Sequence, residues 1–178
     1  FDGTTNLTSA GLSFNNLQLG KTGTITLSTL TLVDNLNVNG NFTVLNDGAT
    51  TFDITNRTVN FSKDVTLANL DTFTITGSTV IFDGTTNLTS AGQAFENVQI
   101  GTATGGGYLK LVGDMDIEGS FTVLDGGLTT FDITGSDVCF DADVNLTNLD
   151  VFTVTNSTVL FDGTTNLTSA GLSFNNLQ

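Results

Sequence analysis

The side chains of this sequence that could do chemistry are few, and most of them are carboxylates. Acidic pairs with one residue between them occur as Asp114-x-Asp116 and Asp141-x-Asp143. Hard carboxylate oxygens at such spacing suit Ca²⁺. The glycine- and aspartate-rich nonapeptide of calcium-binding β-rolls is absent, however, and so is an EF-hand loop. These aspartates are therefore interpreted as acceptors for turn amides, and no metal or cofactor is predicted.

Catalysis is not predicted either. The chain contains no His, which is the usual general base and the commonest metal ligand. Its one cysteine, Cys139, therefore has no histidine to activate it as a nucleophile. Related positions in other repeats hold Asn60, Ile81 and Leu160, which indicates an outward surface position. A lone cysteine also leaves no disulfide within these residues.

The net charge of the chain limits the classes of molecule that it is expected to bind. The chain carries 18 acidic and four basic residues, for a formal net charge of −14. Nucleic acids and anionic membranes both require clustered cations, so neither is a predicted partner. No apolar run approaches the roughly 18 residues of a transmembrane helix. The sequence predicts no membrane span in these residues.

The elements that hold these side chains are set by internal repeats. Phe1–Gln18 recurs residue for residue as Phe161–Gln178, a spacing of 160, and a diverged copy begins at Phe82. The segment FTVLNDGATTFDIT from Phe42 also matches FTVLDGGLTTFDIT from Phe121. Such fixed periods mark stacked-repeat architectures. The prediction is one continuous solenoid over 1–178, made of a 160-residue unit (1–160, with half-repeats 1–81 and 82–160) and the start of the next unit (161–178).

A finer period predicts the fold. The segment from Phe52 aligns with the segment from Phe73 at an offset of 21, which also places Leu67 on Leu88. Apolar residues alternate within each copy, as in strands with one buried face. Thr and Phe favour strands, whereas Gly and Asn favour turns. The expected fold is all-β, a parallel β-solenoid (β-helix) with about three short strands and about 20 residues per coil, and hence eight coils per unit.

The predicted core consists of the Phe, Ile, Val and Leu positions that recur in four coils and stack on one another along the axis. They are Phe52, Ile54, Val59, Phe61, Leu67, Phe73, Ile75, Val80, Phe82, Leu88, Phe131, Ile133, Val138, Phe140, Leu146, Phe152, Val154, Val159, Phe161 and Leu167. A β-sandwich has no reason to repeat at 20 residues, and a propeller blade needs about 40 to 50. A shaft of three intertwined chains remains an alternative.

Two outward patterns carry further hypotheses. Thr72, Thr74 and Thr76 alternate with buried residues and resemble the ice-binding faces of some solenoid antifreeze proteins, although Asp53 interrupts the row in the preceding coil. This pattern supports ice or glycan binding as an alternative function. Ile81 and Leu160 are outward apolar residues at equivalent places in the half-repeats. They are predicted to lie on one side of the shaft, where they could make lateral contacts.

In coil length and residue choice, with its FxI, VxF and NLT segments and Gly/Asn turns, the chain resembles the β-helical shafts of filamentous-haemagglutinin and autotransporter-type adhesins. Segments such as VDNLNVNGNFTV are also similar to repeats of phage and virus fibres. The resemblance implies a rigid rod on the cell surface. The predicted function is a non-catalytic structural segment of a long extracellular fibre, surface filament or adhesin stalk, which assembles with itself end to end or laterally. A phage tail-fibre shaft is the other alternative.

Overall fold

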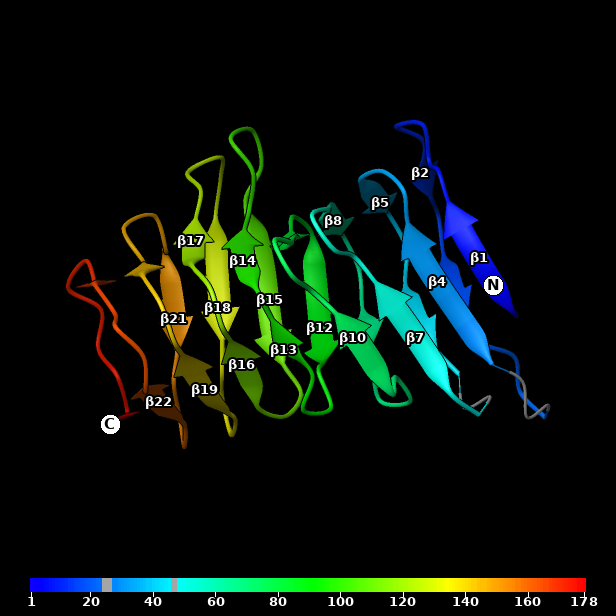
Figure 1. Cartoon of the computed structure of the whole chain (residues 1–178). Coiled ribbons are helices and arrows are strands. Elements are labelled where there is room, and N and C mark those ends of the chain that lie inside the picture. Colours follow the sequence, from blue (N-terminus) through cyan, green and yellow to red (C-terminus); the bar gives the residue numbers. More distant parts are fainter. Residues whose placement is uncertain (24–26, 46–47) are drawn as a thin grey trace.

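The computed structural model describes residues 1–23, 27–45 and 48–178, and these form a parallel β-solenoid. The described residues contain 24 strands and no helix, wound into about seven turns of roughly 22 residues each. Figure 1 shows the turns stacked side by side from the N-terminal to the C-terminal end of the shaft. The predicted all-β solenoid with three strands per turn is confirmed, and the coil is slightly longer than the 20 residues expected.

The strands line three faces, because most strands pair with the strand three places further along the chain; at the C-terminal end β24 pairs with β22 instead. One face is built by sheets A and D in succession. Sheet A contains β1 (Thr4–Leu7), β4 (Ser28–Leu32), β7 (Thr50–Asp53) and β10 (Thr72–Thr74). Sheet D contains β13 (Ala94–Phe95), β16 (Met115–Ile117), β19 (Asp137–Phe140), β22 (Thr158–Phe161) and β24 (Asn176–Leu177).

The other two faces are continuous sheets. Sheet B contains β2 (Ser13–Phe14), β5 (Leu36–Val38), β8 (Thr58–Phe61), β11 (Thr79–Phe82), β14 (Asn97–Ile100), β17 (Phe121–Val123), β20 (Val144–Asn145) and β23 (Leu167–Thr168). Sheet C contains β3 (Leu17–Leu19), β6 (Phe42–Val44), β9 (Val65–Thr66), β12 (Thr85–Thr89), β15 (Gly107–Leu111), β18 (Thr129–Asp132) and β21 (Val151–Thr153).

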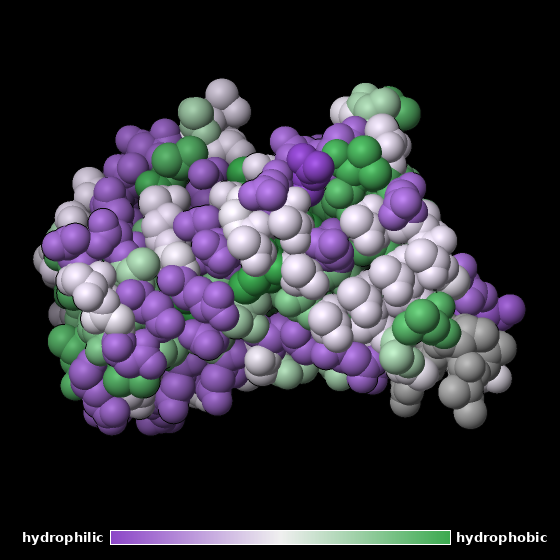
Figure 2. Space-filling view, in the orientation of Figure 1, coloured by the Kyte–Doolittle hydropathy of each residue, from purple (hydrophilic) through white to green (hydrophobic). Residues whose placement is uncertain are grey.

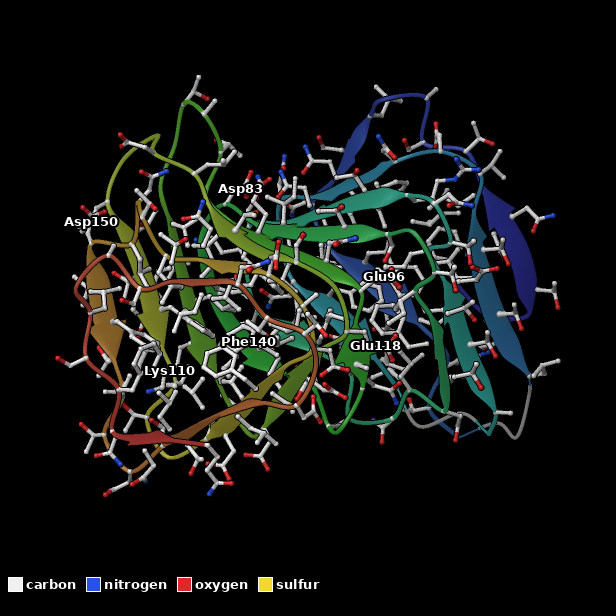
Figure 3. The ribbon with its side chains drawn as sticks, turned by 60° about the vertical axis from the view of Figure 1, so that its left-hand side comes forward. Asp83, Glu96, Lys110, Glu118, Phe140 and Asp150 are labelled. Atoms are coloured by element: carbon white, nitrogen blue, oxygen red, sulfur yellow. The ribbon has the colours of Figure 1, made fainter. Side chains whose placement is uncertain are left out.

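The core is a stack of aromatic and aliphatic ladders. Phe52 pairs with Phe73 in register, and their ring centroids lie 5.7 Å apart. Phe131 and Phe152 repeat this arrangement at 5.8 Å. Each strand alternates buried and outward residues, so the apolar side chains point into the shaft. Figure 3 shows the ring of Phe140 inside the shaft and the charged side chain of Asp150 at its edge.

Fifteen of the predicted core residues are buried, and the five others lie near sheet ends. The half-buried ones, packed against the core, are Phe73, Phe152, Val154 and Phe161. Leu167, predicted to be core, is 38% exposed, and no strand among the described residues pairs with the outer edge of β23. Sheet A likewise ends at β10, which contains Phe73, and sheet C ends at β21, which contains Phe152. These strands have a paired strand on one side only, although the rings of Phe95 and Phe174 pack against Phe73 and Phe152 from the next coil, with centroids 5.6 Å apart in both pairs.

The predicted alignment of Leu67 with Leu88 is wrong by two residues. Leu88 pairs with Val65, and in the second half Leu167 pairs with Val144 rather than with Leu146. The offset between paired residues grows from 21 at Phe61 and Phe82 to 23 at Val65 and Leu88. The additional residues lie at the start of β12, which begins at Thr85, three residues before Leu88, whereas β9 begins at Val65 itself. All the same, Leu67, Leu88 and Leu146 point into the core.

Equivalent segments of the two halves lie eleven strands apart. The sequence TTFD forms β7 in sheet A and β18 in sheet C. At three strands per turn, eleven strands make 3⅔ turns, and the 22 strands from β1 to β23 make 7⅓ turns for each 160-residue unit rather than eight. Each half-repeat therefore starts on a different face from the one before.

Because each half-repeat starts on a different face, the predicted placement of the two outward apolar residues is wrong. Ile81 lies in β11 of sheet B, whereas Leu160 lies in β22 of sheet D. They are on different faces of the solenoid and not on one side, because a half-repeat does not contain a whole number of turns. A lateral contact at either residue stays a prediction.

Glycine is required where one turn lies directly on the next. A Cβ atom on Gly84 would come within 2.1 Å of the carbonyl oxygen of Ser62, and one on Gly163 within 1.8 Å of the carbonyl oxygen of Asp141. Both glycines follow the Phe-Asp pair that ends a strand. The FDG motif thus marks the corner where the backbone crosses closely over the preceding coil.

Candidate functional site

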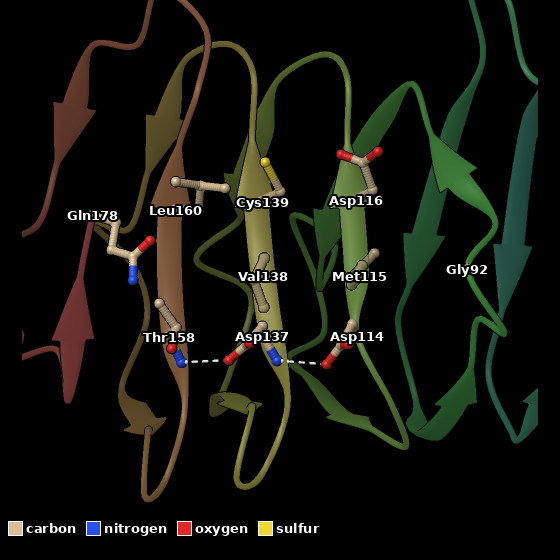
Figure 4. Close-up of a pocket in the computed structure, with 10 residues that line it drawn as sticks. All are labelled: Gly92, Asp114, Met115, Asp116, Asp137, Val138, Cys139, Thr158, Leu160 and Gln178. Atoms are coloured by element: carbon tan, nitrogen blue, oxygen red, sulfur yellow. Dashed lines mark hydrogen bonds between the residues drawn. The ribbon is translucent and has the colours of Figure 1, made fainter.

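A groove of about 340 Å³ that contains carboxyl and thiol side chains lies on sheet D. It runs across β16, β19 and β22, and its sides are formed by neighbouring turns (Figure 4). The lining residues combine acidic, thiol, apolar and amide groups. They are Gly92, Asp114, Met115, Asp116, Asp137, Val138, Cys139, Thr158, Leu160 and Gln178.

The centre of the groove is one outward ladder. Asp116 pairs with Cys139, which pairs with Leu160 on the next strand. Gln178 completes the row, because its N–H donates to the carbonyl of Val159 and its carbonyl accepts from the N–H of Phe161. Figure 4 shows Asp116, Cys139 and Leu160 side by side on successive strands. The parallel register alone brings these chemically different groups together.

The acidic end of this ladder has a distinct electrostatic character. Potential ligand atoms of Asp116, Cys139 and Asp141 all lie within 4.8 Å of one another. The Sγ atom of Cys139 donates to Oδ1 of Asp141 over 3.7 Å. A hydrogen bond to Asp162 is the main cause that raises the pKa of Asp141, and the same bond lowers the pKa of Asp162. Asp141 therefore retains its proton longer and donates it to an ionised Asp162.

The thiol is unreactive in this setting. Burial, followed by the hydrogen bond and the negative charge of Asp162, raises the pKa of Cys139 to about 12. The nucleophilic and metal-binding form of cysteine is the thiolate. Because negative neighbours disfavour ionisation, Cys139 is neutral at physiological pH. The arrangement can share a proton between carboxyl groups, but it does not generate a nucleophile.

Sequence reasoning paired these acids differently. It grouped Asp114 with Asp116 and Asp141 with Asp143, whereas the structure groups Asp116 with Asp141. Asp114 accepts a hydrogen bond from the N–H of Asp137 at 2.8 Å, and Asp143 accepts one from the N–H of Asn166 at 3.1 Å. These two carboxylates satisfy backbone amides, as interpreted from the sequence, but the amides belong to the next coil.

The first half-repeat contains an equivalent groove of about 250 Å³ on sheet B. Its ladder carries Asn37, Asn60 and Ile81 where the sheet D groove carries Asp116, Cys139 and Leu160. The Asn60 Nδ2 and Ser62 Oγ atoms donate to the carboxylate of Asp83 at 2.6 and 2.7 Å. Here one carboxylate is satisfied by two neutral donors. In the second half those donors are replaced by Cys139 and Asp141.

The threonine-rich surface lies on sheet A. Thr4, Thr29, Thr51 and Thr72 form one column across four successive strands. In the neighbouring column Asp53 separates Thr31 from Thr74, as the sequence indicated. Thr76 follows the end of β10 and lies outside the strand. Figure 2 shows a pale region over these strands, opposite the more hydrophilic surface of the C-terminal half.

Comparison with known proteins found no relative of this chain. No family model matches it, and no match is found among curated proteins or solved structures. None of the described residues forms a helix capable of crossing a lipid bilayer. The resemblance to adhesin shafts therefore stays a prediction.

Proposed function

We propose that this chain is a structural segment of a long extracellular fibre, such as a surface filament or an adhesin stalk, and that it has no catalytic activity. Its role is to extend and stiffen a rod. Its partner is another copy of the same structure, and its location is outside the cell. The tip of such a fibre, not this segment, would bind the target.

The observation that carries the proposal is the continuity of the ladders. Sheet B runs through eight strands without a break, and sheet C runs through seven. The buried phenylalanines stack along the same axis, with ring centroids 5.1 to 5.8 Å apart at Phe42–Phe52, Phe52–Phe73, Phe121–Phe131 and Phe131–Phe152. Repeats in such proteins contact only their neighbours, so the structure can be lengthened without altering its core.

The chemistry of the acidic groove supports a structural role. Cys139 has a raised pKa, and the carboxyl groups around it bind one another or backbone amides. The equivalent groove on sheet B carries neutral side chains instead. An enzyme site would depend on one such arrangement, whereas a fibre tolerates either version as long as the coils pack.

The length of multi-unit chains tests this proposal. Chains with one, two and four copies of the 160-residue unit should appear as straight rods in electron micrographs. Each added unit should lengthen the rod by about 35 Å, since 7⅓ turns are spaced at about 4.8 Å. Sedimentation of dilute protein, at concentrations where copies do not associate, should give the mass of a single chain, which separates this proposal from an intertwined trimeric phage shaft. Bent particles, or rods whose length does not grow by a constant amount with each unit, would contradict the proposal.

Ice binding is a second candidate, favoured by the Thr4–Thr29–Thr51–Thr72 column. A regular array of hydroxyl and methyl groups on a flat sheet is the feature that supports it. The chain should then produce thermal hysteresis in freezing assays, and Thr51→Lys should abolish it. Thr122→Lys, on sheet B, is the matched control. No hysteresis in the parent chain would eliminate this candidate.

A further inference from the structure

We propose that a hollow on sheet C binds a neutral sugar ring, with the aromatic ring of Tyr108 as its platform. The hollow has a volume of about 400 Å³ and lies across β12, β15 and β18 where these strands begin. Figure 1 shows the three strands side by side in the middle of the shaft. The ligand is a neutral oligosaccharide or polysaccharide beside the shaft, not the target at the tip of a fibre. The inference goes beyond the proposed fibre function and does not depend on it.

The platform is a half-buried aromatic side chain in the outward row of β15. Tyr108 pairs in register with Thr85 of β12 on one side and with Thr130 of β18 on the other. Its hydroxyl donates to Oδ2 of Asp132 at 3.4 Å, which ties the side chain to the sheet. An aromatic face between two threonines offers an apolar surface with hydroxyl groups on either side. This combination matches a sugar ring, which has an apolar C–H face and a polar edge.

The other lining residues add an apolar wall and a hydrogen-bond acceptor. Leu128 is 73% exposed at the hollow although its side chain is large and apolar. The two carboxylate oxygens of Asp83 each accept one hydrogen bond, from Asn60 and from Ser62, and each retains a lone pair for a ligand hydroxyl. Gly106 contributes no side chain and leaves this part of the hollow open.

The charges around the hollow favour an uncharged ligand. Asp83 and Asp132 would repel an anion, and the formal net charge of −14 acts in the same direction. A cation would instead meet the ammonium group of Lys110, which pairs with Asp132 in register and interacts with its charge. A ligand rich in hydroxyl groups and without net charge avoids both penalties.

The first half-repeat presents the same strands without the platform. In sheet A, the strand equivalent to β15 also lies between strands of sequence TTNL and TTFD. Thr29 stands there in place of Tyr108, and Ala49 stands in place of Leu128. The aromatic ring and the apolar wall therefore distinguish the surface on sheet C from its equivalent. The surface on sheet A is a matched control within the same molecule, and it should not bind the sugar.

The fluorescence of Tyr108 reports on this site alone, because the chain contains no other tyrosine and no tryptophan. The chain is titrated to millimolar concentrations with neutral hexasaccharides derived from cellulose, amylose, xylan, mannan and chitin. At least one of them should change the tyrosine emission in a saturable way. An anionic oligogalacturonate of the same length should bind at least tenfold more weakly than the best neutral sugar.

Three variants locate the binding, measured by saturation-transfer NMR of the best neutral hexasaccharide. Tyr108→Thr installs the residue that sheet A carries and should weaken binding at least tenfold. Leu128→Ala should weaken it severalfold. Adding Thr29→Tyr to the Tyr108→Thr variant moves the aromatic ring to sheet A and should not restore binding. Circular dichroism matching the parent establishes that each variant is folded.

Four outcomes would overturn the proposal. They are no saturable response to any of the neutral sugars, equal binding of the neutral and the anionic sugar, unchanged binding by folded Tyr108→Thr protein, and full recovery in the variant that carries Thr29→Tyr. Tetralysine serves as a cationic probe in the same titration. A response to tetralysine but to none of the sugars would identify a cation site and would also overturn the proposal.

Discussion

At the scale of the residue, the two halves of the chain differ in the side chains that surround the equivalent residues Asp83 and Asp162. Asp83 accepts hydrogen bonds from Asn60 and Ser62, both neutral donors. Asp162 instead faces Cys139 and Asp141, and Asp141 must hold a proton to serve as a donor. The cluster in the first half therefore shows which two substitutions would give Asp162 neutral hydrogen-bond donors.

Replacing Cys139→Asn together with Asp141→Ser should stabilise the chain at pH 7. The two new donors would satisfy Asp162 without requiring a bound proton, and the melting temperature should rise by a few degrees, as expected for one or two ordinary hydrogen bonds. The pKa of Asp141 is raised in the fold, so its contribution is favourable at low pH and is lost as the pH rises through that value. The gain should therefore shrink near pH 4.

Melting curves at pH 4 and pH 7 measure this difference. The reverse exchange in the first half, Asn60→Cys with Ser62→Asp, is the matched control and should lower the melting temperature at pH 7. Equal gains at the two pH values would show that proton sharing between the carboxyl groups is not the cause.

Asp150 provides a contrasting acid whose pKa is lowered by the fold. It accepts the backbone N–H of Thr129 at 2.7 Å and the hydroxyl of the same residue at 3.0 Å. A lowered pKa means that the contribution of Asp150 is complete above the ordinary aspartate value near 4 and is lost as the pH falls below it. Asp150→Asn should therefore destabilise the chain at pH 6 and have little effect at pH 2. Urea unfolding at both pH values provides the measurement, and a constant difference would contradict the prediction.

At the scale of the element, the aromatic ladder contains the largest fully buried side chains of the described residues. Phe131 is fully buried and stacks between Phe121 and Phe152, with ring centroids 5.1 and 5.8 Å away. Phe131→Ala should cost about 3–5 kcal/mol in the free energy of unfolding, because it leaves a cavity between two turns. The half-buried Phe152 is the matched control, and its replacement by Ala should cost less. Equal costs in urea unfolding would mean that stacking between coils contributes little.

The ladders also show how much of the fold could be predicted from the sequence. Strong motifs repeated at a constant offset, such as FxI at Phe52 and Phe73, gave the fold and the correct register. The register was lost between Leu67 and Leu88, because β12 begins three residues before Leu88 whereas β9 begins at Val65, and no side chain signals this difference. Paired residues are separated by as few as 18 positions and as many as 25. A mean period therefore predicts the core but not every pair.

The varying spacing between paired residues also explains why the sequence did not predict the candidate site. Asp116 and Asp141 are 25 positions apart, and only the correct coil register brings them together. Spacing along the chain instead pointed to i, i+2 pairs, whose outer members bind backbone amides of the next coil. Aligning Asn60 with Cys139 and Ser62 with Asp141 across the half-repeats was the signal that could have found the site, because both replacements alter the donors to the aspartate of this cluster.

At the scale of the whole molecule, the eleven-strand half-repeat determines how surfaces recur. The groove of the first half lies on sheet B, and its equivalent in the second half lies on sheet D. A third half-repeat would carry the groove to the remaining face, and a fourth would return it to the first. A longer array would present the same side chains in three directions around the shaft. Its surface would then have a screw symmetry that a repeat of whole turns cannot produce.

An array of four 160-residue units should display this symmetry in electron cryomicroscopy. Each half-repeat should advance the pattern by about 18 Å and rotate it by about two thirds of a turn, so that three half-repeats complete eleven turns in about 53 Å. The loops beyond β14 and β17, which project from the shaft in Figure 1, supply visible markers. Adding one strand to each half-repeat supplies the control, by duplicating the segment 58–64 with β8 in the first half and the segment 137–143 with β19 in the second. Twelve strands make four whole turns and should align the markers on one face. If the markers of the natural array already lie on one face, the half-repeat of eleven strands is contradicted.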